Sequence, residues 1–532
     1  MGEERILFEL GGHGNRIDLR RKSHRNGCVD DARRGWKRDM TAVAPRCAET
    51  GGDRLKNVKI VCTIGPASRD RGTLERLIEA GMDVARINFS HGEHEEHSEV
   101  YERIRGLSDR VAIMQDLQGP KIRVGDIDGG EMALTDGGEI TLTPDEADGS
   151  GGVVNVSYPE LPDDVVAGDS IYLADGIIHL EVEKVTGDRV QCRILHGGVL
   201  TSRKGVNLPG VKISAPALTK KDREDLEFGV ELGVDYVALS FVRNMQEVME
   251  LKRMISKWDS QALVVAKIEK REAIETLNEI IGASDALMIA RGDLGVEIPA
   301  EEVPVIQKSI IAECLRKGKP VITATQMLES MVTTERPTRA EASDVANAVL
   351  DGTDAVMLSA ETATGRYPVE TVNMMSRIIC EAERYVEDGY CERERESIVS
   401  QGSGDWSRLV GEEEGFALTD TVCSGAVKVA EEIGASAIAC LTHSGRTARM
   451  IARYRPNVPV LALTDFLPVV RHMALVWGVR TIPVECIDST ERIFAIVREQ
   501  VKRAGYGGRV VLTAGIPTME RRPTNTVHVI DI

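Results

Sequence analysis

Polar and charged side chains recur at one end of a series of short apolar runs between residues 57 and 385. The bodies of these runs are rich in β-branched and other apolar residues, and chemically useful groups come only where each run ends. If the runs are parallel strands, all of these groups lie at a single rim. They are Arg86 and Asn88, Asp116, Ser240 and Arg243, Lys267 and Glu269, Arg291 and Asp293, Thr325 and Gln326, and Ser359 and Glu361.

Lys267 and Glu269 are two residues apart, so on a strand both side chains point to the same side. Asp293, after the next run, can join Glu269 around a hard divalent cation. Mg²⁺ takes one or two carboxylates and completes its shell with substrate oxygens and water. A lysine–carboxylate ion pair without a metal is the plainer alternative. Arg86 and Arg291 on the same rim favour a pocket for a metal and a multiply charged anion.

Phosphoryl transfer needs positive groups around the oxygens of the transferred group and a metal that bridges them. The predicted rim offers both. The chain has no G-x-x-x-x-G-K-[ST] loop and no protein-kinase motif set, so any nucleotide must be held in another way.

The runs that carry these residues alternate with amphipathic stretches such as Thr73–Ala80 and Glu302–Lys317, a pattern typical of βα units. Eight such units predict an α/β fold built on a closed (β/α)8 barrel. The runs are Lys59–Ile64, Asp83–Phe89, Val111–Leu117, Tyr236–Phe241, Leu263–Glu269, Ala286–Asp293, Pro320–Thr325 and Ala355–Ser359.

Residues 120–217 interrupt this alternation after the third run, so the barrel is expected to comprise residues 57–119 and 218–385. The interruption is rich in Gly, Asp, Val and Thr and includes alternating stretches at Glu139–Thr143 and Ser170–Leu173. It predicts an inserted all-β domain, and a domain placed in a loop on the functional face is positioned to act as a lid.

Three further segments complete the chain. Residues 1–56, rich in Arg and Gly without periodicity, predict a disordered extension, with Met40 as an alternative start. Residues 386–415 are charged and predict a linker. Residues 416–532 return to αβ alternation, with strands expected at Ala437–Leu441, Val460–Thr464 and Arg509–Thr513, and predict an open α/β domain.

The composition excludes some classes of function. A chain of 532 residues is too long for one hydrophobic core, and its 42% apolar and 28% charged content is ordinary for a globular protein. A net charge of −18 argues against nucleic acid as a partner. No apolar run approaches the ~20 residues that span a bilayer, so no membrane contact is expected. Without a signal-peptide core or a C-x-x-C pair, a cytoplasmic location is expected.

From about Asn57 to Ile532 the chain resembles the pyruvate kinase family. The matching segments are long and occur in order, so a chance match is negligible. The resemblance implies a phosphotransferase of the last step of glycolysis, which moves the phosphoryl group of phosphoenolpyruvate to ADP and forms pyruvate and ATP. It also implies a homotetramer with a regulatory C-terminal domain. The segments are TIGPASR (Thr63–Arg69), ARINFSHG (Ala85–Gly92), KGVNLPG (Lys204–Gly210), KIE (Lys267–Glu269), ARGDLGVEIP (Ala290–Pro299), ATQMLESM (Ala324–Met331) and MLSAETATGRYP (Met357–Pro368).

Carried over residue by residue, the resemblance gives Glu269 and Asp293 the role of holding Mg²⁺ or Mn²⁺. The amides of Gly292 and Asp293 would receive the substrate carboxylate, a task suited to a helix N-terminus. Thr325 stands where the family protonates the enolate carbon through water. Because a threonine hydroxyl is a poor acid, we interpret Thr325 as part of a relay with Ser359.

The resemblance also assigns the cations of the rim and the lid. Lys267 would neutralise the phosphoryl group in flight and, with Arg86, bind substrate. Arg86 and Arg123 would contact phosphates. The residues expected near the nucleotide are Asn88, His91, Arg123 and Arg203 or Lys204.

One departure from the family pattern concerns the monovalent cation. Many members bind K⁺ through Asn, Ser and Asp side chains, and Asn88, Ser90 and Asp116 match them. The usual Thr-Lys-Gly-Pro-Glu, however, is Leu-Gln-Gly-Pro-Lys at Leu117–Lys121. The ammonium of Lys121 could replace the cation, which predicts an enzyme that needs Mg²⁺ or Mn²⁺ but not K⁺. A solvated rim position for Lys121 is the alternative.

A second candidate site lies in the C-terminal domain, where Thr-His-Ser-Gly-Arg-Thr follows a predicted strand and opens a helix. Hydroxyls, a glycine and an arginine at such a position can hold a phosphate. The resemblance implies a phosphorylated allosteric effector there, either a sugar phosphate or a nucleotide, whereas a plain capped turn is the alternative. The residues are Thr442, Ser444, Gly445, Arg446 and Thr447.

Two other functions compete with this interpretation. A metal-dependent lyase or aldolase of related barrels would share the carboxylate pair, but would not explain the lid, Arg123 or the KGVNLPG segment. A non-catalytic, effector-binding relative would not need Lys267, Glu269, Asp293 and Thr325 intact.

Overall fold

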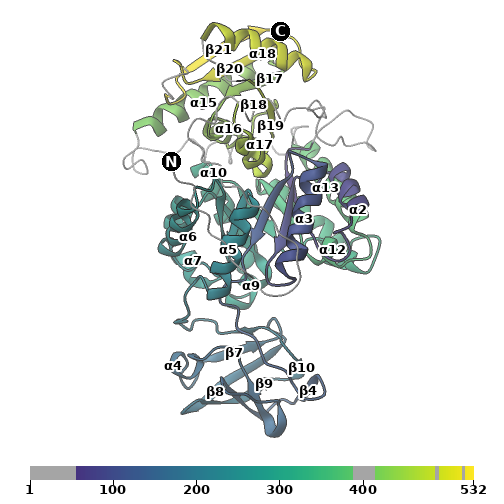
Figure 1. Cartoon of the computed structure of the whole chain (residues 1–532), viewed down its shortest axis with the longest axis vertical. Coiled ribbons are helices and arrows are strands. Elements are labelled where there is room, and N and C mark those ends of the chain that lie inside the picture. The colour runs from purple at the N-terminus through teal and green to yellow at the C-terminus, as the bar shows by residue number, and fades with distance from the viewer. Residues whose placement is uncertain (1–55, 387–413, 486–489, 518–521) are drawn as a thin grey trace, which may run out of the picture. The chain divides into compact units, whose positions relative to one another are not determined.

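The computed structural model describes residues 56–386, 414–485, 490–517 and 522–532. The predicted extension at residues 1–56 and the predicted linker at 386–415 therefore lie almost wholly outside the described residues. The predicted fold class is confirmed: a closed parallel barrel, a strand-rich inserted segment and a C-terminal α/β domain are all present (Figure 1). The exact domain limits stay a prediction.

Each of the eight apolar runs forms one barrel strand, and all strand pairs are parallel. Around the barrel the order is β1-β16-β15-β14-β13-β12-β3-β2, so neighbours along the barrel chain are neighbours in space. The strands are β1 (Lys59–Thr63), β2 (Val84–Asn88), β3 (Ala112–Asp116), β12 (Tyr236–Leu239), β13 (Leu263–Ile268), β14 (Ala286–Ala290), β15 (Val321–Ala324) and β16 (Ala355–Leu358).

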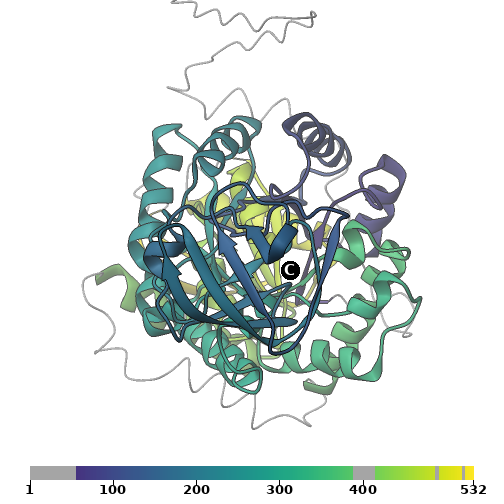
Figure 2. The same ribbon diagram turned by 90° about the horizontal axis from the view of Figure 1, so that it is seen from below.

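Helices surround the strands as an outer ring (Figure 2). Strands covered on both faces read as continuous apolar runs rather than alternating ones, and for that reason the sequence located them well. The inner face is filled by residues such as Val61, Met114, Tyr236 and Met288, so the barrel is a packed core and not a pore. The helices are α2 (Arg71–Ala80), α3 (His94–Leu107), α5 (Lys220–Leu232), α6 (Met245–Lys257), α7 (Arg271–Glu275), α8 (Leu277–Ala283), α9 (Arg291–Glu297), α10 (Val303–Lys317), α11 (Arg339–Leu350), α12 (Ala360–Ala363) and α13 (Pro368–Tyr385), with a 3-10 turn at Glu329–Val332.

The segment between β3 and α5 builds its own apolar core from alternating residues of its strands, including Leu142, Leu180 and Val190. One sheet has the order β11-β7-β8-β9-β5-β6, and β10 pairs with β4. We call this segment the lid. Its elements are β4 (Glu131–Leu134), β5 (Glu139–Thr143), β6 (Val153–Asn155), α4 (Leu161–Asp164), β7 (Ser170–Leu173), β8 (Ile178–Thr186), β9 (Arg189–His196), β10 (Gly198–Thr201) and β11 (Val206–Asn207), with a 3-10 turn at Ser150–Gly152.

The C-terminal domain has a five-stranded sheet in the order β19-β18-β17-β20-β21, in which only β21 is antiparallel to its neighbour. Apolar clusters cover both faces, as expected for an open α/β sheet. The predicted strands at Ala437–Leu441 and Val460–Thr464 are confirmed. The elements are α15 (Glu414–Glu432), β17 (Ala437–Leu441), α16 (Arg446–Ala452), β18 (Val460–Thr464), α17 (Leu467–His472), a 3-10 turn (Met473–Leu475), β19 (Val479–Pro483), α18 (Thr490–Arg503), β20 (Arg509–Ala514) and β21 (Thr526–Asp531). No helix in the described stretches is both long and apolar enough to cross a membrane.

Helix α5, which follows the lid, begins at a capping box that also holds the other end of the lid segment. The Thr219 hydroxyl accepts from the Asp222 amide, and the Asp222 carboxylate accepts from the Thr219 amide. The second oxygen of the buried Asp222 accepts a hydrogen bond of 3.0 Å from the amide of Gly119, where the chain leaves β3. One side chain thus fixes both chain ends at which the lid is inserted.

Glu383, in the last turn of α13, holds the start of β1. Its carboxylate accepts hydrogen bonds from the amides of Asn57 (2.9 and 3.0 Å) and Val58 (2.7 Å). Complete burial raises the pKa of Glu383 from its ordinary value of 4.5 to about 7. The folded protein therefore binds this proton more tightly than the unfolded chain does. The stabilisation from this group is fully present below pH 4.5 and is lost as pH rises through about 7.

We predict that Glu383→Gln removes this pH dependence. Urea unfolding at pH 5 and at pH 7.5 measures the free energy of unfolding of both proteins. Between these pH values, the wild type should lose up to about 3 kcal/mol more of it than the variant does. Glu381→Gln, on the exposed face of the same helix, is the control and should follow the wild type. Parallel pH profiles for wild type and Glu383→Gln would contradict the prediction.

Candidate active site

Lys267, near the end of β13, is the centre of a buried polar cluster at the carboxyl ends of the barrel strands. Its Nζ lies 3.2 Å from Asp116 Oδ1, 3.0 Å from Glu269 Oε1 and 2.7 Å from Ser240 Oγ. Burial by itself would lower the pKa of Lys267, but the carboxylates of Asp116 and Glu269 outweigh it and hold the pKa above its ordinary value. The ammonium is therefore charged at neutral pH.

Arg86, on β2, extends the cluster on the other side of Asp116. Its Nε donates to Asp116 Oδ2 at 2.6 Å, and its Nη1 donates to Thr63 Oγ1 at 2.9 Å. Burial would raise the pKa of Asp116, but Lys267 and Arg86 hold it below its usual value. Two cations thus share Asp116, and Lys267 also contacts Glu269, so this buried cluster balances two cations against two carboxylates.

Glu269 and Asp293 are the pair predicted to hold a divalent cation. Glu269 is buried and accepts a hydrogen bond of 2.7 Å from the amide of Phe241. Burial raises the pKa of Glu269 and the Asp293 carboxylate raises it further, while Lys267 opposes them. Two carboxylates that repel each other in a buried site favour a cation between them.

This donor set fits magnesium better than a metal that needs an all-protein cage. In the described part of the chain, no three or more His, Cys, Asp and Glu side chains gather as a metal-binding group. Mg²⁺ commonly takes only one or two carboxylates and retains water or substrate oxygens for the rest of its shell. Glu269 and Asp293 can supply that pair.

Lys121 lies where the chain leaves the barrel for the lid, and its Nζ is 3.6 Å from Asp293 Oδ1. Both side chains are roughly a quarter exposed, so the ion pair is accessible from the mouth.

Partial desolvation, and then the charges of Arg123, Lys121 and Arg86, lower the pKa of His91. Three of the predicted cations therefore act on one imidazole, which stays neutral near pH 7.

Thr325 follows β15 in a strained turn. Its hydroxyl accepts a hydrogen bond of 2.8 Å from the amide of Gly292 and donates one of 2.6 Å to the carbonyl of Ala324. Thr325 and Gln326 both have positive φ, at 65° and 54°, a conformation that costs non-glycine residues about 1–3 kcal/mol each. The Gly292 amide, predicted to receive the substrate carboxylate, is thus bonded to Thr325 in this state.

Arg291 contacts this turn rather than the predicted anion pocket. Its Nη1 and Nη2 each lie 2.8 Å from a carboxylate oxygen of Asp344. Nη2 also donates to the carbonyl of Thr325 at 2.7 Å. Because its donors are committed to the turn and to Asp344, Arg291 holds the strained backbone in place. This differs from the anion-binding role that its position on the rim predicted.

The predicted relay between Thr325 and Ser359 is not a direct contact, since no hydrogen bond joins the two side chains in the described structure. The amide of Ser359 donates to Glu361 Oε2 at 2.6 Å, and Glu361 Oε1 accepts from the Leu328 amide at 3.2 Å. Glu361 is completely buried. It joins the loops after β15 and β16 and so sets the spacing of the two hydroxyl residues.

The predicted nucleotide-binding residues divide into two groups. Asn88 lies at the end of β2, and its side chain accepts a hydrogen bond of 3.1 Å from the Ser90 amide. Arg123 donates to the carbonyl of Arg203 at 3.2 Å. Arg203 itself pairs with the lid carboxylate Asp126, at 2.8 and 3.2 Å, and both are largely exposed.

Lys204 is also exposed. Asn88 and His91 therefore belong to the barrel side, whereas Arg203 and Lys204 stand on the lid surface. Arg123 contacts Arg203, and its charge acts on His91.

Two functional contacts went beyond the sequence prediction. Ser240 was placed on the rim, but its hydrogen bond to Lys267 was not anticipated. Thr63, which supports Arg86, is the first residue of the TIGPASR segment, and that position was the available signal.

The second candidate site, in the C-terminal domain, is a tight loop between β17 and α16. Gly445 has a φ of 76°, a conformation that is strained for residues with a side chain, and a Cβ there would also displace the end of the flexible Met473 side chain. The buried hydroxyls of Thr447 and Thr524 are hydrogen-bonded at 2.7 Å. This bond brings the loop after β20 beside the predicted phosphate-binding residues.

A parallel barrel that gathers charged Lys267, Arg86 and a carboxylate pair at its strand ends, beneath a β-rich insertion, defines a barrel enzyme of the phosphotransferase class. The family model for the pyruvate kinase barrel domain matches residues 55–372, and that for the pyruvate kinase alpha/beta domain matches residues 420–530. The chain belongs to the pyruvate kinase family.

Individual relatives agree. The chain is 45% identical over 487 residues to a pyruvate kinase of Geobacillus stearothermophilus, covering 89% of this chain and 80% of the relative. It is 44% identical over 471 residues to pyruvate kinase 2 of Synechocystis sp., covering 86% and 76%. It is also similar to the crystal structure of a pyruvate kinase from Cryptosporidium parvum, with a TM-score of 0.80, 35% identity, and coverage of 90% of this chain and 96% of that chain.

We predict that Lys267→Met lowers turnover by about 10³-fold or more, because it removes the central cation of a phosphoryl-transfer site. Initial rates with phosphoenolpyruvate and ADP measure this, and circular dichroism checks the fold. Lys270→Met is the matched control. Lys270 is equally buried, but its ammonium pairs with Glu297 at 2.5 Å.

Both substitutions leave a buried carboxylate without its cation, so both variants should be destabilised to a similar degree. The control should keep turnover within about tenfold of the wild type. Near-normal turnover of Lys267→Met, or equal losses in both variants, would refute the role of Lys267.

Proposed function

We propose that this chain is a magnesium-dependent pyruvate kinase that transfers the phosphoryl group of phosphoenolpyruvate to ADP. The observation that supports it most is the buried, charged Lys267, held between Asp116 and Glu269 with Arg86 beside them. A site that keeps cations charged while excluding water is suited to a multiply charged anion whose charge shifts during reaction.

In the proposed reaction, a terminal oxygen of ADP forms a bond to the phosphorus of phosphoenolpyruvate as the bond to the enol oxygen breaks. Lys267 and Arg86 compensate the negative charge on the transferred group and keep it in line between the two oxygens. When bound to Glu269 and Asp293, Mg²⁺ or Mn²⁺ would supply further positive charge to the oxygens of the substrate. The products are ATP and the enolate of pyruvate.

The enolate must then gain a proton on its terminal carbon. Without substrate, the Thr325 hydroxyl is bonded to the Gly292 amide and the Ala324 carbonyl, and the first of these bonds must break before Gly292 can bind the substrate carboxylate. The pKa of a threonine hydroxyl is too high for it to give up its own proton and stay ionised. We therefore assign Thr325 and Ser359 the task of holding a water molecule that delivers the proton. Gly292 and Asp293 would bind the substrate carboxylate through their amides once Thr325 shifts.

The nucleotide would lie between the barrel mouth and the lid. His91, whose pKa is lowered by partial burial and then by the surrounding cations, can hydrogen-bond to the nucleotide without adding charge, and Arg123 would contact its phosphates. Asn88 would line the same side. Arg203 and Lys204 can join only if the lid brings its exposed surface toward the ligand, and Arg203 must then exchange Asp126 for a phosphate.

The proposed function predicts that pyruvate forms from phosphoenolpyruvate only when ADP and a divalent cation are both present. A coupled lactate dehydrogenase assay measures it. Omitting ADP or adding a chelator should lower the rate by about 100-fold or more, since the metal carries several kcal/mol of transition-state stabilisation. Excess Mg²⁺ or Mn²⁺ should restore it. Pyruvate release without ADP would instead indicate a lyase, and no turnover under any condition a non-catalytic relative.

We further propose that Lys121 replaces a monovalent cation. Its ammonium lies 3.6 Å from Asp293, and the chain retains Asn88, Ser90 and Asp116, which match the family's K⁺ ligands. A fixed ammonium at that position would supply the positive charge that K⁺ supplies in other members.

This proposal predicts that turnover in tetramethylammonium buffer changes less than about twofold when KCl is added. In Lys121→Glu the charge is reversed, so turnover without KCl should fall by about tenfold or more and recover when KCl is added. Lys204→Glu, an exposed lid lysine, is a charge-matched control that should not acquire a KCl requirement. A strong K⁺ requirement in the wild type would overturn the proposal.

For the C-terminal site we propose a phosphorylated allosteric effector bound by Thr442, Ser444, Gly445, Arg446 and Thr447. The tight turn at Gly445 and the neighbouring Thr524 support it, because both place polar groups around one loop. A sugar phosphate and a nucleotide both remain compatible with this chemistry. Assembly as a homotetramer and a cytoplasmic location remain proposals that rest on the family resemblance.

A further inference from the structure

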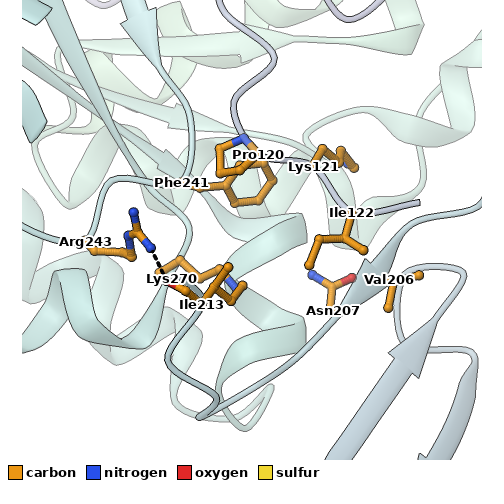
Figure 3. Close-up of a pocket in the computed structure, with 9 residues that line it drawn as sticks. All are labelled: Pro120, Lys121, Ile122, Val206, Asn207, Ile213, Phe241, Arg243 and Lys270. Atoms are coloured by element: carbon orange, nitrogen blue, oxygen red, sulfur yellow. Dashed lines mark hydrogen bonds between the residues drawn. The ribbon is translucent and has the colours of Figure 1, made fainter. Parts of the chain in front are cut away.

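The chain returns from the lid to the barrel through residues 209–218, and one side chain of the barrel forms hydrogen bonds with this connection. Arg243, in the loop between β12 and α6, donates from Nη1 to the carbonyl of Ile213 at 2.7 Å. Its Nη2 donates to the carbonyl of Ala215 at 2.9 Å. Figure 3 shows the Arg243 guanidinium directed at Ile213, with the hydrogen bond drawn. A planar guanidinium is suited to bind two carbonyls in fixed geometry.

Two side chains of the lid also form hydrogen bonds with this connection. The Ser214 amide donates to Asp164 Oδ2 at 2.8 Å, and the Ser214 hydroxyl donates to Asp164 Oδ1 at 2.6 Å. The hydroxyl of the buried Tyr158 also accepts from the Ser214 amide, at 3.0 Å. Asp164 ends helix α4 of the lid, and Tyr158 belongs to the lid core.

The carbonyl of Ile213 and the amide of Ser214 belong to one peptide group, which is planar and rigid. In a trans peptide the carbonyl and the N–H point to opposite edges of that plane. The barrel therefore holds one edge, through Arg243, and the lid holds the other, through Asp164. This single peptide group is therefore hydrogen-bonded both to the barrel and to the lid.

Arg243 is itself held in place by the barrel. Its Nε donates to Glu247 Oε1 at 2.8 Å, its amide donates to Glu247 Oε2 at 2.8 Å, and its carbonyl accepts from the Thr276 hydroxyl at 2.9 Å. The same loop contacts the candidate active site. Ser240 bonds to Lys267, and the amide of Phe241 bonds to Glu269. Within four residues, this loop touches the central cation, a candidate metal ligand and the connection of the lid.

We propose that Arg243 is a positioning residue that sets the lid over the active site by clamping the Ile213–Ser214 peptide, with Asp164 as the clamp on the lid side. Through the Ser240–Arg243 loop, the position of the lid is tied to that of Lys267 and Glu269. Without Arg243, this connection is held only from the lid side, so the barrel no longer sets the position of Arg123 on the lid. The kinetic part of this inference rests on the proposed function, whereas the structural part does not.

Hydrogen exchange of the substrate-free protein tests the structural part. In Arg243→Gln, the amides of residues 211–218 should exchange about tenfold faster or more, because two hydrogen bonds from a charged donor are lost. Asp164→Asn should have a similar effect, localised to Ser214. Arg243→Lys keeps the charge but cannot bind two carbonyls at once, so its exchange should be intermediate. Arg223→Gln is the control, since Arg223 pairs with Glu250 on the barrel surface.

Initial-rate kinetics on the same variants test the functional part. Arg243→Gln should raise the KM for ADP by about tenfold, with a smaller effect on the KM for phosphoenolpyruvate, because the lid contributes the nucleotide contacts. Arg243→Lys should recover part of the affinity for ADP, and Arg223→Gln should match the wild type. A loss of global stability alone would not separate the two KM values in this way.

The outcomes distinguish this inference from the proposed function. Unchanged exchange at residues 211–218 in both Arg243→Gln and Asp164→Asn overturns the clamp, whatever the activity. Faster exchange with equal KM changes for both substrates overturns the positioning role. If neither the wild type nor any variant forms pyruvate, the proposed function fails. The hydrogen-exchange result still decides whether the Ile213–Ser214 peptide is clamped.

Discussion

The buried ammonium of Lys267 is the constraint on which the active end of the barrel depends. A charge removed from water is costly unless oppositely charged and hydrogen-bonding groups surround it. The required partners come from three different strands: Asp116 ends β3, Ser240 follows β12, and Glu269 follows β13 with Lys267 itself on that strand. The closure of the barrel is therefore what makes a charged lysine tolerable in a nearly dry site.

From this centre the charges alternate outward. Asp116 is shared with Arg86, and Glu269 is affected by Asp293, which in turn pairs with Lys121. Asp116 thus lies between two cations, whereas Glu269 and Asp293 each have one cation beside them and act on each other. Such a series of charged side chains can accept a metal and a phosphoryl group with little rearrangement, because the charges are already in place before the ligands bind. The pyruvate kinase family, to which this chain belongs, is consistent with that arrangement.

Backbone geometry is constrained at the same rim. Thr325, Gln326 and Phe241 all have positive φ, and each is followed or supported by a side chain that holds the turn. Arg291 binds the carbonyl of Thr325, and Phe241 donates its amide to Glu269. Strained turns persist only when surrounding contacts over-determine them. The rim therefore uses several of its charged groups to hold the backbone, whereas Lys267, Arg86 and Lys121 are paired with carboxylates.

The amino-acid sequence by itself determined the barrel and the composition of its rim. Strands covered on both faces need unbroken apolar runs, and polar residues can occur only where those runs end, so Lys267, Glu269 and Asp293 were visible as candidates. The five-stranded C-terminal sheet was only partly visible in the sequence: β17, β18 and β20 are apolar runs, whereas β19 is mostly half-buried and β21 is mostly exposed.

Only the tertiary structure decided which partner each long side chain takes. Arg291 pairs with Asp344, 53 residues further along the chain, and Arg243 binds Ile213, 30 residues before it. Flexible arginine side chains can reach many carboxylates and carbonyls, and the choice depends on which of them the folded backbone brings within hydrogen-bonding distance. Residue type and spacing reveal the donors, but their acceptors are set by packing between elements distant in sequence.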